Sequence, residues 1–297
     1  MSKRSAELKQ AEKGAIVSII AYVILAVLKL GIGSYANSKA LYADGLNNFT
    51  DTIASVAILI GLRLSRKPAD NEHRYGHWKA ENVASLLTSL VMFVVGFEVL
   101  KNAVESLIHK NIQQPEPIAA FVGIFSAIVM YGVYLYNKKL GEKYNSSSLI
   151  AVSKDNFSDM LTSLGAAIAV FTAAFQLAWL DTVTALIIAL IILKTAFDIF
   201  KESTFYLSDG FDKEKLVLYK QEILKNPDIR VVPVLRARTL GANIFLDVTV
   251  KVNPNLTVRE SHEIVDNMEK HLKETFNIFD IDVHVEPYED IYPPKEN

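Results

Sequence analysis

Apolar residues fill six long stretches in the first two thirds of the chain, and each stretch is long enough to cross a bilayer as a helix. A membrane-spanning helix needs roughly 20 predominantly apolar residues to bridge a hydrocarbon core about 30 Å thick. The stretches are Ala15–Ile32, Ala40–Leu62, Val83–Leu100, Ile118–Tyr136, Leu149–Phe175 and Leu177–Phe200. This pattern predicts an all-α bundle of six transmembrane helices within a domain at residues 1–206.

Beyond residue 206 segments with helical periodicity alternate with segments that have strand periodicity, which is typical of a small soluble domain. We place this domain at residues 207–297. Thr257 and Glu260 form a capping-box pattern at the start of its second helix. The predicted helices and strands are, in chain order, Asp212–Asn226, Arg230–Thr239, Ile244–Val252, Thr257–Phe276 and Ile281–Val285. The order αββαβ is typical of a ferredoxin-like or metallochaperone-like α+β fold with both helices on one side of an open sheet.

Lysine and arginine concentrate in the leader before the first span, between the second and third spans, and between the fourth and fifth. By the positive-inside rule these basic segments face the cytoplasm, so both termini are expected there. The C-terminal domain is then cytoplasmic, and the protein is a multi-pass protein of the cell (inner) membrane.

The composition narrows the possible partners. Hydrophobic residues make up 51% and charged residues 22% of the 297 residues, and the formal net charge of −2 gives no reason to expect nucleic acid. The chain contains no cysteine, which excludes a disulfide framework and a thiolate zinc cluster. Any metal chemistry must therefore use aspartate, glutamate, asparagine and histidine.

Two pairs of polar residues, Asn47/Asp51 and Asp155/Asp159, interrupt the second and fifth apolar stretches. Each pair is spaced i, i+4 and shares one helix face, and Asp44 extends the first pair by about one turn. A carboxylate near the centre of a bilayer costs about 2.5–3.5 kcal/mol on insertion scales, so a cation is expected to meet these groups. Packed together, the two faces would form a four-ligand oxygen site for a metal ion or for protons.

The alternative is that these side chains only join helices through hydrogen bonds, each worth about 0.6–2 kcal/mol. Serine, threonine and asparagine could do so without carboxylates, and we expect no lysine or arginine on either polar face. Lys29, Lys101 and Lys194 are interpreted as side chains that snorkel towards the membrane surface.

The connection between the second and third spans carries Asp70, His73 and His77, called the loop cluster below. An aspartate with two histidines suits a zinc-like ion. A solvated loop can also collect such residues by chance, which is the alternative.

Four residues of the C-terminal domain could converge on a further metal: Asp247, His262, His284 and Glu286. Strand alternation places His284 and Glu286 on the same face. Solvated side chains are the alternative, and His109 and His271 are interpreted as surface residues.

Three segments resemble the signature segments of the cation diffusion facilitator family: Ala40–Asp51, Pro68–Glu81 and Ser153–Asp159. The family's members are proton-coupled exporters of divalent transition metals, with six helices followed by an αββαβ cytoplasmic domain. The resemblance covers essentially the whole chain. It implies a homodimer in the lipid bilayer that exports a divalent metal in exchange for protons by alternating access, without a resident cofactor.

By position, Asn47, Asp51, Asp155 and Asp159 match the family's transport tetrad. Asp155 stands where zinc-selective members have histidine, and Asn47 stands where zinc- and iron-exporting relatives have aspartate. Three carboxylates and one amide favour a harder ion, so Mn²⁺ is the first expectation and Zn²⁺ the second, with Fe²⁺ and Co²⁺ still open. Like charges held close make full ionisation costly, so an emptied site would take up protons.

The resemblance also implies roles outside the tetrad. The loop cluster matches a metal site of relatives, and Lys79 and Asp209 match partners in a charge interlock between the helices and the dimer hinge. An ordinary surface ion pair worth about 0–1 kcal/mol is the alternative for Lys79 and Asp209. The match in the C-terminal domain is incomplete, because Pro233 and Thr249 stand where some relatives have histidine.

An intramembrane aspartyl protease would also carry aspartates on two helices. It would need a GxGD-type segment, which the chain lacks, since Asp44 and Gly45 stand in the reverse order. The sequences HExxH and GxxxxGK[ST] are absent too, so nothing supports a metalloprotease or an ATP-driven pump. A metal channel, with flux but no proton exchange, and a sensor, with binding but no flux, are further alternatives to a transporter.

Overall fold

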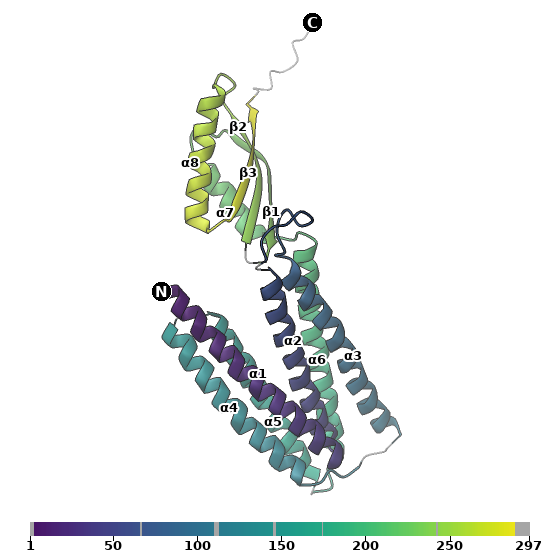
Figure 1. Ribbon diagram of the computed structural model, residues 1–297. Coiled ribbons are helices and arrows are strands. Elements are labelled where there is room, and N and C mark those ends of the chain that lie inside the picture. Colours follow the sequence, from purple (N-terminus) through teal and green to yellow (C-terminus); the bar gives the residue numbers. More distant parts are fainter. Residues whose placement is uncertain are drawn as a thin grey trace. The chain divides into compact units, whose positions relative to one another are not determined.

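The computed structural model describes residues 3–65, 67–109, 113–144, 147–173, 175–241 and 243–288. Within these ranges six long helices precede a small domain of two helices and three strands (Figure 1). The described residues divide into two compact units, one within Met1–Ile60 and Ala84–Phe200 and the other within Gly61–Val83 and Lys201–Asn297. The connection between the second and third helices therefore belongs to the same unit as the C-terminal domain.

The six long helices are α1 Lys3–Tyr35, α2 Lys39–Ser65, α3 Ala80–Ile108, α4 Ile118–Tyr144, α5 Ser147–Ala173 and α6 Trp179–Leu207. Each overlaps one predicted apolar stretch, and α1, α3 and α4 extend well beyond theirs. The last two predictions ran two residues too far into the connection between α5 and α6, where Gln176 adopts a left-handed φ of 64° that ends helical geometry.

Four helices, α1, α3, α4 and α6, each contain a stretch that is long and apolar enough to cross a membrane, among the described residues. The other two long helices, α2 and α5, are the ones that carry the polar pairs. Charged and amide side chains lower their mean hydropathy, so composition alone does not mark them as spans.

Two helix groups make up the first unit (Figure 1). In the first group α1, α4 and α5 pack on one another, and a Cβ at Gly123 of α4 would lie 2.9 Å from the Cβ of Ala167. In the second group α2, α3 and α6 share an apolar cluster that includes Ala43, Val99 and Ile188. Small residues thus allow close helix approach, as is usual in membranes.

The two groups meet near the turn that joins α1 to α2. A Cβ at Gly33 would lie 2.7 Å from the backbone nitrogen of Tyr42, and one at Gly45 would lie 2.9 Å from that of Leu30. Only glycine fits at such distances, so α1 and α2 are in close contact at this end.

The C-terminal domain consists of α7 Lys213–Ile223, β1 Val231–Leu240, β2 Asn243–Val252, α8 Val258–Phe276 and β3 Asp280–Pro287. Strand β2 pairs antiparallel with β1 and parallel with β3, so the sheet order is β1-β2-β3. The predicted order αββαβ and the capping box of Thr257 and Glu260 are confirmed. Helix α7 ends three residues before the predicted Asn226, because the chain turns there, with Asn226 N donating to Ile223 O.

Both helices and the sheet of this domain share one hydrophobic core. Along β2, Leu246, Val248 and Val250 are buried in this core, while Asp247 and Thr249 between them point to the opposite face. We call that opposite face the open face of the sheet. The buried core residues are Tyr219, Ile223, Ile229, Val232, Leu246, Val248, Val250, Val252, Val265, Met268, Leu272, Ile278 and Ile281.

Candidate metal site

Three of the four residues in the predicted polar pairs are in direct contact. The Asn47 side chain, only 8% exposed, donates from Nδ2 to Asp51 Oδ2 and to Asp159 Oδ1, at 3.1 Å in each case. Asn47 and Asp51 meet through the i, i+4 spacing of α2, whereas Asp159 comes from α5, 112 residues further along the chain. The fold thus gathers carboxylate and amide groups from both helix groups.

Asp155, the fourth residue, lies one turn before Asp159 on α5. Its side chain is exposed, whereas Asp51 is half-buried and Asp159 is buried. No hydrogen bond joins Asp155 to the other three in the part of the chain that the structure describes. The cluster therefore consists of three contacting side chains and one accessible carboxylate beside them.

A hydrogen-bond network not predicted from the sequence supports Asp159. Tyr22 of α1 donates from Oη to Asp159 Oδ2 at 2.9 Å, and Asn156 Nδ2 donates to Tyr22 Oη at 2.8 Å. Asn137 of α4 donates to Asn156 Oδ1 at 2.8 Å and to Ser18 Oγ of α1 at 2.9 Å. Side chains from α1, α4 and α5 thus fix the position of one carboxylate of the cluster.

The expectation that Lys29 snorkels to the membrane surface is wrong. Lys29 is 0% exposed, and its Nζ lies 2.8 Å from Asp44 Oδ2. It also donates to Asn48 Oδ1 at 2.6 Å and to Ser163 Oγ at 2.8 Å. Within the part of the chain that the structure describes, neither Asp44 oxygen accepts an aligned hydrogen bond, so the contact of Asp44 with Lys29 is an ion pair. A lysine therefore does neutralise a carboxylate on the α2 polar face, because oxygens of three residues offset the cost of its burial.

The sequence carried a signal for these α1 contacts. Ser18, Tyr22 and Lys29 are spaced i, i+4 and i+11, which places them on one face of α1. By contrast, Lys101 and Lys194 are 71% and 79% exposed and pair with acidic residues one turn along their own helices. A shared face distinguishes the buried lysine from the two exposed ones.

The loop cluster is a compact group in the second unit. Asp70 Oδ1 lies 3.2 Å from His73 Nδ1, and Asp70 Oδ2 lies 3.4 Å from His77 Nε2. Asp70 Oδ1 also accepts from the backbone N–H of His73 at 2.6 Å, which holds the pKa of the Asp70 carboxyl below its usual range. Among the described residues this is the only group of three His, Asp or Glu side chains whose ligand atoms all lie within 4.8 Å of one another.

Comparison with known proteins identifies the family. Residues 15–208 match the model of the cation efflux transmembrane domain, and residues 211–288 match that of the cation efflux protein, cytoplasmic domain. The chain belongs to the cation diffusion facilitator family. It is 48% identical over 287 residues to manganese efflux system protein MneS of Bacillus subtilis. The aligned region covers 97% of this chain and 99% of MneS.

Two further relatives of this cation diffusion facilitator are also matched over most of their length. Manganese efflux system protein MneP of Bacillus subtilis is 30% identical over 285 residues, with 93% of this chain and 96% of MneP covered. Cation-efflux pump FieF of Shewanella oneidensis is 27% identical over 271 residues, with 91% of this chain and 92% of FieF covered. The chain is thus a multi-pass membrane transporter for divalent metal efflux and not an enzyme, and its cytoplasmic dimerisation domain indicates a homodimer.

In this cation diffusion facilitator Lys79 and Asp209 form an ion pair. Lys79 Nζ lies 2.9 Å from Asp209 Oδ1 and 3.5 Å from the carbonyl oxygen of Leu207 at the end of α6. Beside this pair the Trp78 ring lies 5.5 Å from the Phe279 ring of the C-terminal domain. The side chains of Lys79 and Asp209 are 37% and 54% exposed, so the ion pair itself is worth about 0–1 kcal/mol.

The four candidate ligands of the C-terminal domain do not meet within one chain. His262, 72% exposed on α8, pairs with Asp266 on the same helix, whereas Asp247 lies on the open face of the sheet and pairs with Arg238. His284 and Glu286 share the face of β3 that points away from the core, with 3.8 Å between His284 Nε2 and Glu286 Oε1. Helix α8 packs on the core side of the sheet, so His262 and Asp247 lie on different sides of it.

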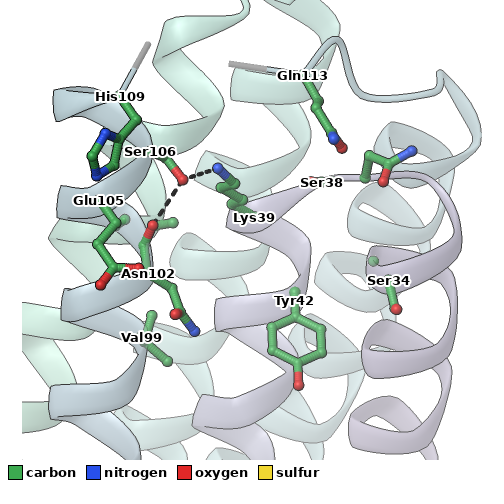
Figure 2. Close-up of a pocket in the computed structure, with 14 residues that line it drawn as sticks. Ser34, Ser38, Lys39, Tyr42, Val99, Asn102, Glu105, Ser106, His109 and Gln113 are labelled. Atoms are coloured by element: carbon green, nitrogen blue, oxygen red, sulfur yellow. Dashed lines mark hydrogen bonds between the residues drawn. The ribbon is translucent and has the colours of Figure 1, made fainter. Parts of the chain in front are cut away.

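A cavity of about 480 Å³ lies near the α1–α2 turn (Figure 2). Lys39 donates from Nζ to Ser106 Oγ inside it, and His109, interpreted above as a surface residue, lies on its wall. The remaining lining residues are Gly33, Ser34, Asn37, Ser38, Tyr42, Val99, Asn102, Ala103, Glu105, Gln113 and Ala185. Polar and apolar groups thus line the cavity together, and they come from α1, α2, α3, α6 and the turns beside them.

Proposed function

We propose that this transporter exports Mn²⁺ in exchange for protons, with Asn47, Asp51, Asp155 and Asp159 as its transport site. The observation that carries the proposal is the contact of Asn47 with Asp51 and Asp159, which gathers oxygen ligands inside the helical domain. Carboxylates at membrane depth are costly unless they meet a cation, so a transported ion gives this cluster a physical reason to exist.

The choice of manganese rests on ligand chemistry and on relatives. The four side chains offer carboxylate and amide groups without imidazole or sulfur, a set that suits a hard ion such as Mn²⁺. MneS and MneP, at 48% and 30% identity, are both named for manganese efflux. An exporter of Zn²⁺, Fe²⁺ or Co²⁺ is the alternative within the family.

Asn47 gives the site two states. In the structure its amide N–H groups face Asp51 and Asp159, where they partly balance two carboxylates. Half a turn of the amide about its last side-chain bond would present Oδ1 to a metal ion in the same place. Protons would compete with the metal for the same carboxylates, which couples metal release to proton uptake.

Alternating access follows from where the ligands come from. Asn47 and Asp51 belong to the α2/α3/α6 group, and Asp155 and Asp159 belong to the α1/α4/α5 group (Figure 1). Relative movement of the two groups would expose a metal between them first at one end and then at the other. Asp155 is exposed and α1 and α2 are packed tightly at their turn, so we infer that this state is open at the end where α5 begins.

The same proposal fixes the topology. All six long helices span the membrane as one domain at residues 1–206, and α2 and α5 are polar because they carry the site. Basic connections place both termini, and the domain at residues 207–297, in the cytoplasm of a cell whose plasma membrane holds the dimer. Manganese thus enters from the cytoplasm and leaves beyond the α1–α2 turn.

Two accessory roles accompany transport. The loop cluster binds a zinc-like ion and reports cytoplasmic metal rather than carrying the exported ion, since it lies outside the helices. Lys79 and Asp209 act as a charge interlock between the helices and the dimer hinge. The open-face residues Asp247, His284 and Glu286 bind metal only if a second protomer completes the site, with His262 as the ligand it could supply.

Flux measurements in proteoliposomes test the transport site. Under an imposed pH gradient, the parent protein should move Mn²⁺ one way and protons the other. Asp51→Asn keeps the size of the side chain but removes its charge, and it should abolish this flux. Asp198→Asn on the exposed side of α6 is the matched control and should transport as the parent does.

Parental flux in Asp51→Asn would refute the site assignment, and Mn²⁺ flux without proton movement would indicate a channel. Mn²⁺, Zn²⁺, Fe²⁺ and Co²⁺ compared side by side then test the ion. If neither Asn47→Asp nor Asp155→His changed the preference for Mn²⁺, the donor atoms of the tetrad would not be what selects the ion.

A further inference from the structure

A buried ion pair lies between the proposed transport site and the cavity near the α1–α2 turn. Along α2 the order is Tyr42 on the cavity wall, then Asp44, then Asn47 of the tetrad. Along α1 the order runs from Tyr22, the partner of Asp159, through Lys29 to Gly33 on the cavity wall. On both helices the ion pair therefore separates the site from the cavity.

The ion pair also joins three helices. Lys29 of α1 contacts Asp44 and Asn48 of α2, and it donates to Ser163 of α5. Ser163 in turn donates to the backbone carbonyl of Asp159, so the contact lies one turn from the tetrad on α5 as well. A single ammonium thus links both helix groups directly beside the transport site.

The packing around the pair leaves no passage for a hydrated ion in this state. The side chains of Lys29 and Asp44 are both 0% exposed, and a Cβ at Gly45 would lie 3.0 Å from the Cβ of Lys29. On the other side of the pair, the cavity offers amide, hydroxyl, carboxylate and imidazole groups, of which Asn102 and Glu105 lie on α3 and His109 directly follows this helix (Figure 2).

Stability alone does not explain this arrangement. A buried ion pair often contributes no more to folding than apolar residues of the same volume, because desolvation offsets the attraction. Such pairs serve best where they fix one of two alternative packings. Among the described residues none donates an aligned hydrogen bond to Asp44, so the ion pair can separate without disrupting a hydrogen-bond network around this carboxylate.

We propose that Lys29 is a positioning residue of the release path. Its ammonium holds α1, α2 and α5 together on the cavity side of the tetrad, and the divalent metal ion reaches the cavity only after this contact separates. This role rests on the proposed transport site, since it concerns the ion that leaves that site.

A cysteine-labelling experiment on the purified full-length protein tests the proposal. The chain has no native cysteine, so Ala40→Cys introduces the only thiol. Ala40 is 0% exposed and packs against Ala166 and Ala169 of α5, so a charged, water-soluble maleimide reaches it only when α2 and α5 part at this end. The labelling rate is measured without metal for the parent and for Lys29→Met/Asp44→Asn.

The double variant should be labelled about tenfold faster than the parent, because the closed packing loses its link and becomes less populated. Lys29→Arg, which keeps the positive charge, should be labelled at a rate close to that of the parent. Lys194→Met/Asp198→Asn removes an exposed Lys–Asp pair of α6 and is the matched control, with no expected change. The KM for Mn²⁺ transport should stay within about threefold of the parental value while kcat changes, since the tetrad itself is intact.

An unchanged labelling rate in the folded double variant would overturn the role of Lys29. If that variant does not fold, Lys29→Gln/Asp44→Asn, which removes both charges but keeps a polar side chain at each position, decides the question in the same way. Labelling needs neither metal nor flux, so a negative result here leaves the transport site standing. Conversely, parental flux in Asp51→Asn would refute the transport site without altering the labelling result.

Discussion

The proposed transport site and the loop cluster both gather acidic side chains, but they do so in opposite ways. The transport site joins α2 and α5 across 112 residues, lies within the helical domain and offers no imidazole. The loop cluster comes from one short connection, includes two histidines, and leaves Asp70 and His73 about half exposed. Movement of helices can open and close only the first, which supports our proposal that transport takes place there and that the loop cluster senses metal.

Substitutions in the proposed transport site and in the loop cluster should differ most in their effect on the transport rate. Asp159→Asn should lower Mn²⁺ transport about 100-fold, since removing one partner of a buried charged group costs about 3 kcal/mol and each 1.4 kcal/mol is a factor of ten. His73→Gln should change it less than about threefold, because in the proposed mechanism the loop does not carry the transported ion. Flux in proteoliposomes measures both, and equal losses would erase the distinction between the two clusters.

A smaller loss is expected where the transport site depends on support from α1. Tyr22→Phe removes a hydrogen bond to Asp159, and bonds to charged groups are worth about 1.5 kcal/mol or more, which corresponds to about a tenfold fall in kcat/KM for Mn²⁺. Tyr206→Phe, a tyrosine outside the site near the end of α6, is the control. Parental kinetics for Tyr22→Phe would mean that the α1 network does not position Asp159 for metal binding.

Acid should act on the loop cluster through its histidines. The pKa of Asp70 is lowered in the folded protein, so its stabilising contacts persist above its ordinary pKa of about 3.9 and are lost only as pH falls through the lower folded value. Imidazoles must lose protons to bind metal, and two of them compete with protons here, so Zn²⁺ affinity should fall by about 100-fold or more between pH 7 and pH 5. Calorimetry on the parent and on His73→Gln/His77→Gln checks this, and a pH dependence that survives the double substitution would point to other ligands.

The smallest expected effect concerns the ion pair of Lys79 and Asp209. Lys79→Gln should lower the free energy of unfolding by less than about 1 kcal/mol, because both side chains are partly exposed. Chemical denaturation measures this change. A loss of transport with unchanged stability would support the interlock. Parental transport would instead mean that Lys79 and Asp209 form an ordinary surface ion pair.

Local spacing made much of the molecule predictable. The i, i+4 pairs on α2 and α5, the loop cluster and the capping box at Thr257 depend on residues close in sequence, and each keeps its local geometry in the fold. Contacts between distant residues were harder to foresee. The buried position of Lys29 and the bond from Tyr22 to Asp159 depend on how α1 packs against α2 and α5. Likewise, nothing local indicated that α8 holds His262 on the other side of the sheet from Asp247.

Pulsed electron paramagnetic resonance of bound Mn²⁺ tests most directly whether the exported ion binds the helix oxygens. In His73→Gln/His77→Gln, Mn²⁺ should still bind and show no directly coordinated nitrogen, because Asn47, Asp51, Asp155 and Asp159 supply oxygen alone. Adding Asp159→Asn should abolish this signal. The opposite result is that the parent shows a coordinated nitrogen and that His73→Gln/His77→Gln loses both this nitrogen and the bound ion. The metal would then bind in the loop cluster, which would contradict the proposed transport site.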